Sequence, residues 1–181
     1  AAAGSREAVP VGYDGPPPPV PPEVIARDAA GRVTIRAVRI ETPLSIDGRL
    51  DEAVYGDVPA ISGFIQNEPM EGAPASEKTE VWILYDRDTF YVVGRCWETH
   101  PERMVANEMR RDNINIVQND QFAFTLDTFY DRRNSFLFEI GAAGGRIDGQ
   151  VTNERQVTLD WNPVWETAVG RFEGGWTVEA A

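Results

Sequence analysis

Three aspartates are the residues of this chain best suited to hold a metal ion. Asp112, Asp120 and Asp127 fall between and around two segments that read as strands. Hard cations such as Ca²⁺ bind about six to eight oxygen ligands, and carboxylates in loops supply such oxygens. The spacing follows no defined calcium loop, and aspartate is also an ordinary turn residue. A structural calcium site and plain turn chemistry are therefore both open interpretations.

Tryptophans form the second group, and the chemistry that they suggest is sugar binding. A pyranose ring has apolar C–H faces and polar edges, so flat aromatic faces with a few polar groups can grip it. Trp161 lies in a loop context, where an indole can be exposed, and Trp97 lies near the turn that holds His100. We expect Trp161 to be the first sugar contact, and Trp97 with His100 to be the second. Core packing is the alternative for any tryptophan in a strand.

Signatures of an enzyme are absent from the sequence. It contains no glycine-rich phosphate loop, no metal-spaced histidine or cysteine set and no Ser-His-Asp constellation. No carboxylate pair is singled out for glycoside hydrolysis. Cys96, the only cysteine, lies in an apolar run and is expected to be a buried, inert thiol. We therefore expect no catalysis in this segment, and a hydrolase is the third hypothesis.

The composition limits the classes of partner that this chain is expected to bind. The chain has 181 residues and a formal net charge of -12. This charge argues against binding to nucleic acid or to an anionic membrane surface, which both attract clustered Lys and Arg. A neutral ligand, a cation or a basic partner fits better. No run of about 18 apolar residues exists, so no transmembrane helix is expected in this segment.

The elements that must position these residues are mostly strands. Seven of the 13 prolines fall in the first 22 residues, which predicts an extended proline-rich arm over 1–31 and a β-domain over 32–181. Period-two alternation over 79–86, a turn at 86–89 and a returning run over 90–97 predict a hairpin. Short helices are expected at 49–55 and 99–110. Further strands are expected at 121–126, 136–140, 146–151, 165–169 and 176–179.

This pattern predicts an all-β fold, an antiparallel β-sandwich or jelly roll with one or two short helices. The apolar residues that alternate along the two strands expected at 121–126 and 136–140 are expected to be mostly buried. They are Phe122, Phe124, Phe136 and Phe138.

Several segments together resemble a known family. They are IDGRLDEAVY at 46–55, the polar loop 68–80 leading into VWILYD at 81–86, NDQF at 119–122, DWNPVWE at 160–166 and GWTVE at 175–179. Over roughly residues 35–181 the chain resembles a family 9 carbohydrate-binding module. The resemblance is closest to the DOMON-like version found at the front of large bacterial outer-membrane proteins.

The resemblance implies a non-catalytic domain that binds a polysaccharide or oligosaccharide and assists glycan binding or degradation. It also implies structural calcium and a secreted, periplasmic or outer-membrane location. In relatives, the strand that matches 175–179 is followed by further strands. The resemblance therefore implies an incomplete sandwich here. It also implies that a downstream domain of the same protein is a partner. The parent protein could then be linked to glycoside hydrolysis and carbohydrate catabolism.

The resemblance also implies an alternative. Where sugar-binding members carry a tryptophan, a glutamate and an arginine, this sequence has Val117, Ala123 and Leu137. A structural or docking domain of an outer-membrane β-barrel protein, without sugar binding, is therefore the second hypothesis.

Overall fold

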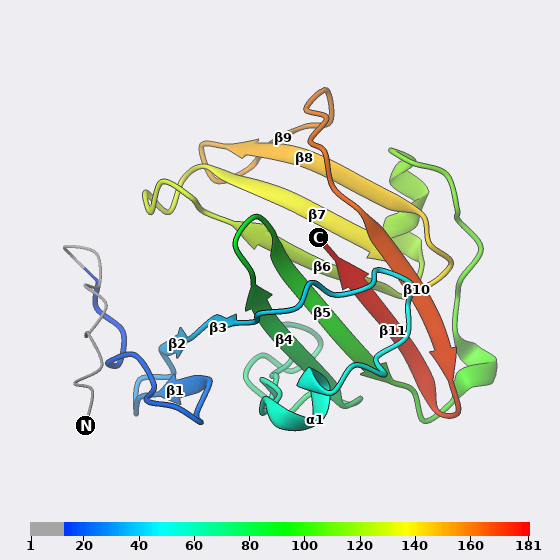
Figure 1. Cartoon of the computed structure of the whole chain (residues 1–181). Coiled ribbons are helices and arrows are strands. Elements are labelled where there is room, and N and C mark those ends of the chain that lie inside the picture. Colours follow the sequence, from blue (N-terminus) through cyan, green and yellow to red (C-terminus); the bar gives the residue numbers. More distant parts are fainter. Residues whose placement is uncertain (1–12) are drawn as a thin grey trace. The chain divides into compact units, whose positions relative to one another are not determined.

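The computed structural model describes residues 13–181 of the chain (Figure 1). The chain divides into two compact units, Ala1–Arg36 and Ala37–Ala181, and each is described by itself. The boundary expected between residues 31 and 32 falls inside the first unit. Residues 1–12 of the predicted arm lie outside the described residues.

The described part of the first unit contains one small hairpin. Strand β1 (Ile25–Arg27) pairs antiparallel with β2 (Val33–Ile35). The Asp28 carboxylate shapes the turn between them, because it accepts hydrogen bonds from the backbone amides of Ala30 and Arg32, both at 2.9 Å. Residues 13–24 form neither helix nor strand, as expected for a proline-rich segment that lacks amide donors.

The second unit contains two sheets, and they confirm the predicted all-β sandwich. The first has the strand order β10-β11-β5-β4-β3. Its strands are β3 (Val38–Arg39), β4 (Thr79–Tyr85), β5 (Phe90–Trp97), β10 (Thr167–Phe172) and β11 (Gly175–Ala180). All neighbours in this sheet are antiparallel except β3 and β4, which are parallel.

The second sheet has the order β6-β7-β8-β9, and all its pairs are antiparallel. Its strands are β6 (Gln121–Leu126), β7 (Ser135–Gly141), β8 (Arg146–Thr152) and β9 (Gln156–Thr158). The register pairs Phe124 with Phe138, and Phe138 with Asp148. Side chains paired across neighbouring strands lie on one face of a sheet, so these three share a face.

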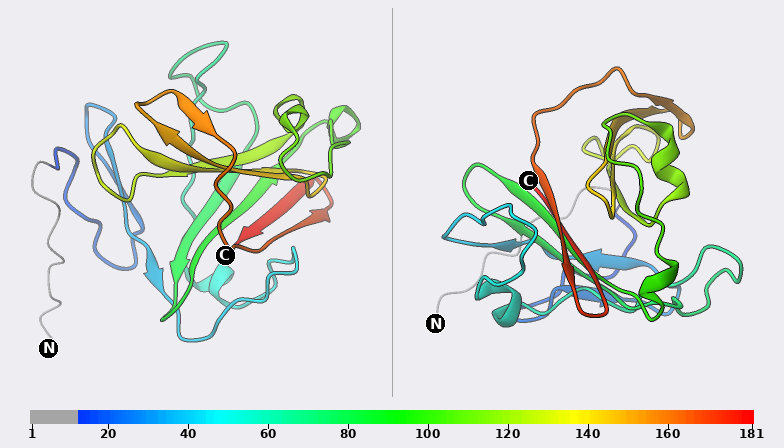
Figure 2. Two further views of the ribbon diagram at one scale, coloured as in Figure 1. Left: turned by 90° about the horizontal axis from the view of Figure 1, so that it is seen from above. Right: turned by 90° about the vertical axis from the view of Figure 1, so that its right-hand side faces the viewer.

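The two sheets face each other as layers (Figure 2). One apolar cluster lies between them and includes Ile140 of β7 with Trp176 and Val178 of β11. A second cluster covers the other face of the five-stranded sheet, where Trp82 and Leu84 pack against the segment around α1 (Val54–Asp57). The central residues of β5, from Tyr91 to Gly94, are buried on both faces, as the apolar content of the hairpin predicts.

Helix is scarcer than the sequence suggests. The helix expected over 99–110 is wrong, because only the 3-10 turn η1 (Pro101–Arg103) forms there. The following amides instead bond to distant side chains: the amide of Val105 donates to Asp120 Oδ2 at 2.7 Å and that of Asn107 to Asn119 Oδ1 at 2.8 Å. The helix expected at 49–55 is a single turn at its end, α1.

A further 3-10 helix, η2 (Ile114–Gln118), precedes β6. Within residues 13–181, no helix is long and apolar enough to span a bilayer.

Candidate functional site

Trp161 lies on the inner face of the four-stranded sheet. Its indole stacks on the ring of Phe136, with centroids 4.4 Å apart and an interplanar angle of 24°. It also meets Phe138 edge to face at 5.8 Å. Alternation along β7 puts both phenylalanines on one side of the strand. Trp161 remains partly exposed. The connection from β9 to β10 therefore presents an indole to solvent, and the rings of Phe136 and Phe138 pack against its other side.

A buried carboxylate holds this connection in place. Asp148 of β8 has no exposed surface, and its Oδ1 accepts hydrogen bonds from Arg111 Nη2 at 2.8 Å and Trp165 Nε1 at 3.0 Å. Arg111 Nη2 also donates to Asn162 Oδ1 at 2.8 Å. Because Asn162 directly follows Trp161, the guanidinium ties the tryptophan loop to the strand beneath it.

Trp165 extends the aromatic surface. It meets Phe138 edge to face at 5.0 Å, and the Arg146 guanidinium lies 5.1 Å from the centre of its ring. Cations over indole faces are attracted by the ring quadrupole. Trp165 is therefore fixed from two sides, while Trp161 is held through its stacking on Phe136 and through its neighbour Asn162.

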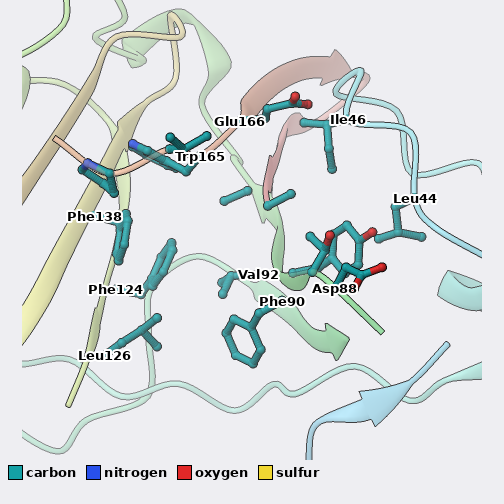
Figure 3. A pocket seen from close by; sticks show the side chains of 16 residues that line it. Leu44, Ile46, Asp88, Phe90, Val92, Phe124, Leu126, Phe138, Trp165 and Glu166 are labelled. Carbon is teal, nitrogen blue, oxygen red and sulfur yellow. The ribbon is translucent and has the colours of Figure 1, made fainter. Parts of the chain in front are cut away.

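An open cleft of about 520 Å³ lies beside this surface, between the two sheets (Figure 3). Phe124, Phe138 and Trp165 lie on one side of it, and Phe90 and Val92 on the other. Asp88, Thr89 and Glu166 are among the few polar residues at its wall. The cleft has the size and the mainly apolar lining of ligand pockets, which span roughly 300–1,000 Å³.

The four phenylalanines expected to be mostly buried, Phe122, Phe124, Phe136 and Phe138, each keep only a minor part of their surface exposed. Phe122 and Phe124 pack against the apolar cluster between the sheets, and Phe124 and Phe138 also line the cleft. Alternation along the two strands therefore predicted the inward face correctly.

The second expected sugar contact lies elsewhere. Trp97, at the end of β5, meets Phe172 edge to face at 4.9 Å, and the Lys78 ammonium lies 5.2 Å from its ring centre. His100 is exposed and its Nδ1 lies 3.2 Å from Glu102 Oε1. These ring partners differ from the partners of Trp161, so the structure does not join the two tryptophans in one platform.

The carboxylates of the three aspartates considered for calcium each bind a donor group of the protein itself. Asp112 pairs with Arg111 at 3.3 Å. Asp120 accepts from the amide of Val105, and Asp127 caps the turn after β6 by accepting from the amides of Phe129 and Arg132. Within residues 13–181 no group of three or more His, Cys, Asp or Glu is placed to hold a metal ion. Calcium binding therefore stays a prediction from the sequence.

Val117, Ala123 and Leu137 are the positions at which the sequence departs from the sugar-binding members that it resembles. Ala123 pairs with Glu139 across β6 and β7, and Leu137 pairs with Thr125, so these two lie on the opposite face of the four-stranded sheet. Val117 lies in η2 and is 49% exposed. Burial raises the pKa of Glu139, and its Oε2 has no hydrogen-bond partner among the described residues. None of the three positions carries an aromatic ring, and the unpartnered Glu139 oxygen is buried.

Sequence reasoning missed Arg111, Asp148 and Phe136 as parts of the Trp161 surface. Asp148 left no clear signal, because its strand has the sequence RIDGQVT and contains other polar residues. Its partner could not be identified from spacing, since Arg111 lies 37 positions earlier in the chain.

Comparisons with known proteins agree with this architecture. No family model matches the chain, and a search of curated proteins gives no match. Two solved structures are similar: a family 9 carbohydrate-binding module from Caldicellulosiruptor kristjanssonii in complex with cellotriose (TM-score 0.53) and one from the same organism in complex with glucose (TM-score 0.54). Each is 18% identical, and the alignment covers 80% of this chain.

The chain covers 64% of the first of these modules and 66% of the second. At this identity the likeness concerns the fold: this chain has the fold of a family 9 carbohydrate-binding module over most of its length.

Proposed function

We propose that this chain is a non-catalytic carbohydrate-binding module. The observation that carries the proposal is the shared fold with two modules solved in complex with cellotriose and with glucose. Fold alone does not fix function, so the proposal also rests on the partly exposed Trp161 and its support by Phe136. Together they supply a scaffold that holds sugars in similar proteins and a rigid indole on which a sugar ring can stack.

The proposed ligand is a neutral oligosaccharide or polysaccharide. A net charge of -12 disfavours acidic glycans, whereas neutral sugars are recognised by stacking and hydrogen bonds to hydroxyl groups. Asn162 lies next to Trp161, and its amide Nδ2 is only weakly engaged, at 3.5 Å from the carbonyl oxygen of Asp160. This amide and the Arg111 guanidinium are the polar groups proposed to bind sugar hydroxyls beside the indole.

A location outside the cytoplasm belongs to the same proposal. Polymeric glycans are too large to cross a bacterial inner membrane, so a module that binds them acts as a secreted, periplasmic or outer-membrane-associated domain. Assistance to glycan degradation by other domains of the same protein follows from this role. Immunodetection in cell fractions of the producing bacterium tests the location, and detection in the cytoplasm alone would contradict it.

Affinity electrophoresis through gels that contain single polysaccharides tests the binding class. We expect retardation by at least one neutral β-glucan, and no retardation by an acidic polymer such as polygalacturonate. The Trp161→Ala variant is expected to migrate as in a gel without polysaccharide. Absence of retardation in every gel would favour the alternative, a docking domain, which the replacement of family sugar contacts by Val117, Ala123 and Leu137 already supports.

A further inference from the structure

The outer face of the five-stranded sheet carries a partly exposed tryptophan. Cys96 of β5 packs against the apolar cluster between the two sheets, and side chains alternate along a strand. The next residue, Trp97, therefore points to the outer face, where it is partly exposed. The other tryptophans of this sheet, Trp82 and Trp176, are only 3% and 4% exposed. Trp97 is thus the indole of this sheet that solvent reaches.

Four side chains at one end of β4 and β5 form a compact group on this face, the Trp97 array. Glu80 of β4 is the cross-strand partner of Arg95 on β5. The amide of Trp97 donates to the carbonyl oxygen of Lys78 at 2.9 Å, so Lys78 lies opposite Trp97. Opposite residues lie about 5 Å apart, and residues two positions apart in one strand about 7 Å. A single sugar ring can therefore contact all four side chains.

The polar groups of the Trp97 array are charged, accessible and only partly engaged. The side chains of Lys78, Arg95 and Glu80 are 58%, 28% and 17% exposed. Glu80 Oε1 lies 2.7 Å from Lys78 Nζ, whereas Glu80 Oε2 lies 3.4 Å from both Arg95 Nη1 and Trp97 Nε1. Hydrogen bonds between N–H groups and oxygen are normally about 2.7–3.2 Å long. Glu80 Oε2 can therefore accept a shorter bond from a hydroxyl group of a ligand.

The indole of Trp97 is supported at its edge. Phe172 of β10 meets it edge to face at 4.9 Å, across strand β11. Gly175 of β11 makes this contact possible, because an added Cβ there would lie 2.7 Å from the Phe172 ring. Lys78, the only lysine of the chain, holds its ammonium group 5.2 Å from the centre of the indole. Its flexible and exposed side chain can leave the indole face without any change in the backbone.

A neutral glycan fits this combination of groups better than a charged ligand does. Sugar hydroxyl groups both donate and accept hydrogen bonds, so they can pair with the Glu80 carboxylate and with the cations of Lys78 and Arg95 at once. An anion would be repelled by Glu80, and a cation would be repelled by Lys78 and Arg95. The apolar face of a sugar ring can stack on the Trp97 indole.

We propose that the Trp97 array is a second site for neutral glycans, separate from the Trp161 surface. This proposal rests on the carbohydrate binding proposed above. Trp161 stacks on Phe136 at the inner face of the other sheet, so a module with both sites holds two glycan chains. Sugar binding displaces the Lys78 ammonium group from the indole, which makes the Trp97 array the weaker of the two sites.

Two-dimensional ¹H–¹⁵N NMR of the whole chain, titrated with cellotriose, tests the proposal. Each tryptophan gives one indole N–H signal, and the signals of Trp97 and Trp161 are identified by their loss in Trp97→Phe and Trp161→Phe. We expect both signals to shift, with the midpoint of the Trp97 shift at a higher sugar concentration. In Trp161→Ala, the Trp97 signal should shift with a midpoint within about twofold of its midpoint in the unmodified chain.

A matched pair of substitutions tests the polar part of the array. Glu80→Gln keeps the shape of the side chain and replaces a charged acceptor by a weaker neutral one. It should raise the midpoint of the Trp97 shift about three- to tenfold. Glu173→Gln makes the same change at an exposed position in the turn between β10 and β11, and should leave this midpoint within about twofold. The NMR spectrum itself shows whether each variant is folded, and the titration of the unmodified chain needs no variant.

Two results would overturn this proposal alone. One is a Trp97 signal that stays unchanged while the Trp161 signal shifts to saturation. The other is a Trp97 shift that Trp161→Ala abolishes, because the response would then be transmitted from the Trp161 surface. If no indole signal shifts with cellotriose, carbohydrate binding itself fails this test, and the second site fails with it.

Discussion

The hydroxyl group of Tyr55 donates a 2.9 Å hydrogen bond to the carboxylate of Glu179, 124 positions further along the chain. The other oxygen of Glu179, which is completely buried, accepts from the amides of Asp47 and Gly48 at 3.0 and 2.8 Å. Gly48 adopts a φ of 83°, which favours glycine. One carboxylate on β11 thus fastens the loop before α1 to the five-stranded sheet.

Tyr55→Phe is expected to lower the free energy of unfolding by about 1–3 kcal/mol, because it leaves one buried Glu179 oxygen without a donor. Urea unfolding followed by tryptophan fluorescence measures the difference. Tyr85→Phe is the matched control, since the Tyr85 hydroxyl makes no side-chain hydrogen bond with residues 13–181. Equal loss of stability in both variants would contradict the fastening role of Tyr55.

Glu108 is predicted to make the free energy of unfolding depend on pH. Hydrogen bonds from the side chain and the amide of Arg110 lower the pKa of Glu108 to about 2 from its ordinary 4.5. The folded state therefore binds fewer protons than the unfolded state between about pH 2 and pH 4.5. This contribution to stability is complete above the ordinary pKa and is lost as pH falls through the window.

Glu108→Gln is expected to flatten the fall in melting temperature between pH 4.5 and pH 2, because glutamine does not titrate. Thermal unfolding at a series of pH values measures the slope. Glu102→Gln, which removes an exposed carboxylate, should leave the slope close to that of the unmodified chain. The interpretation fails if Glu108→Gln retains the full slope.

Cys96 is predicted to be nearly unreactive in the folded protein. Burial, with a smaller contribution from the charge of Asp120, raises the pKa of its thiol to about 12, and thiolate is the reactive form. At pH 8 the folded protein should therefore react with Ellman's reagent at least about a hundredfold more slowly than the protein in 6 M guanidinium chloride. Rapid stoichiometric reaction of the folded chain would contradict this burial.

Arg111 is expected to stabilise the tryptophan loop as well as the fold. Arg111→Ala leaves the buried Asp148 with only the Trp165 indole as a side-chain donor, and this should lower the free energy of unfolding by about 1–3 kcal/mol. It should also shift the tryptophan emission of the folded state to longer wavelength. Arg87→Ala, at a site where the side chain is 90% exposed, should change neither quantity.

The longer strands could be predicted from local sequence, because alternation along 121–126 and 136–140 directly reports which residues share a face. The short strands β1, β2, β3 and β9 were not predicted. The 99–110 segment could not, since its amides bond to Asp120 and Asn119, and such partners leave no local pattern. The position of Trp161 in an exposed loop was predictable from its neighbours. Its fixation through Arg111 and Asp148 was not, because that network joins three segments far apart in sequence.

Isothermal titration of the unmodified chain, Trp161→Ala and Trp97→Ala with cellotriose tests the central claim most directly. We predict measurable binding by the unmodified chain. Loss of a stacking platform costs about 1–3 kcal/mol, by analogy with base stacking on aromatic side chains, so Trp161→Ala should raise Kd about 5- to 150-fold. Trp97→Ala, whose indole contacts Phe172 and lies beneath Lys78, should change Kd less. Binding of equal strength by the unmodified chain and Trp161→Ala would contradict the assigned platform, and no binding by the unmodified chain to cellotriose or to any neutral glycan would contradict the proposed function.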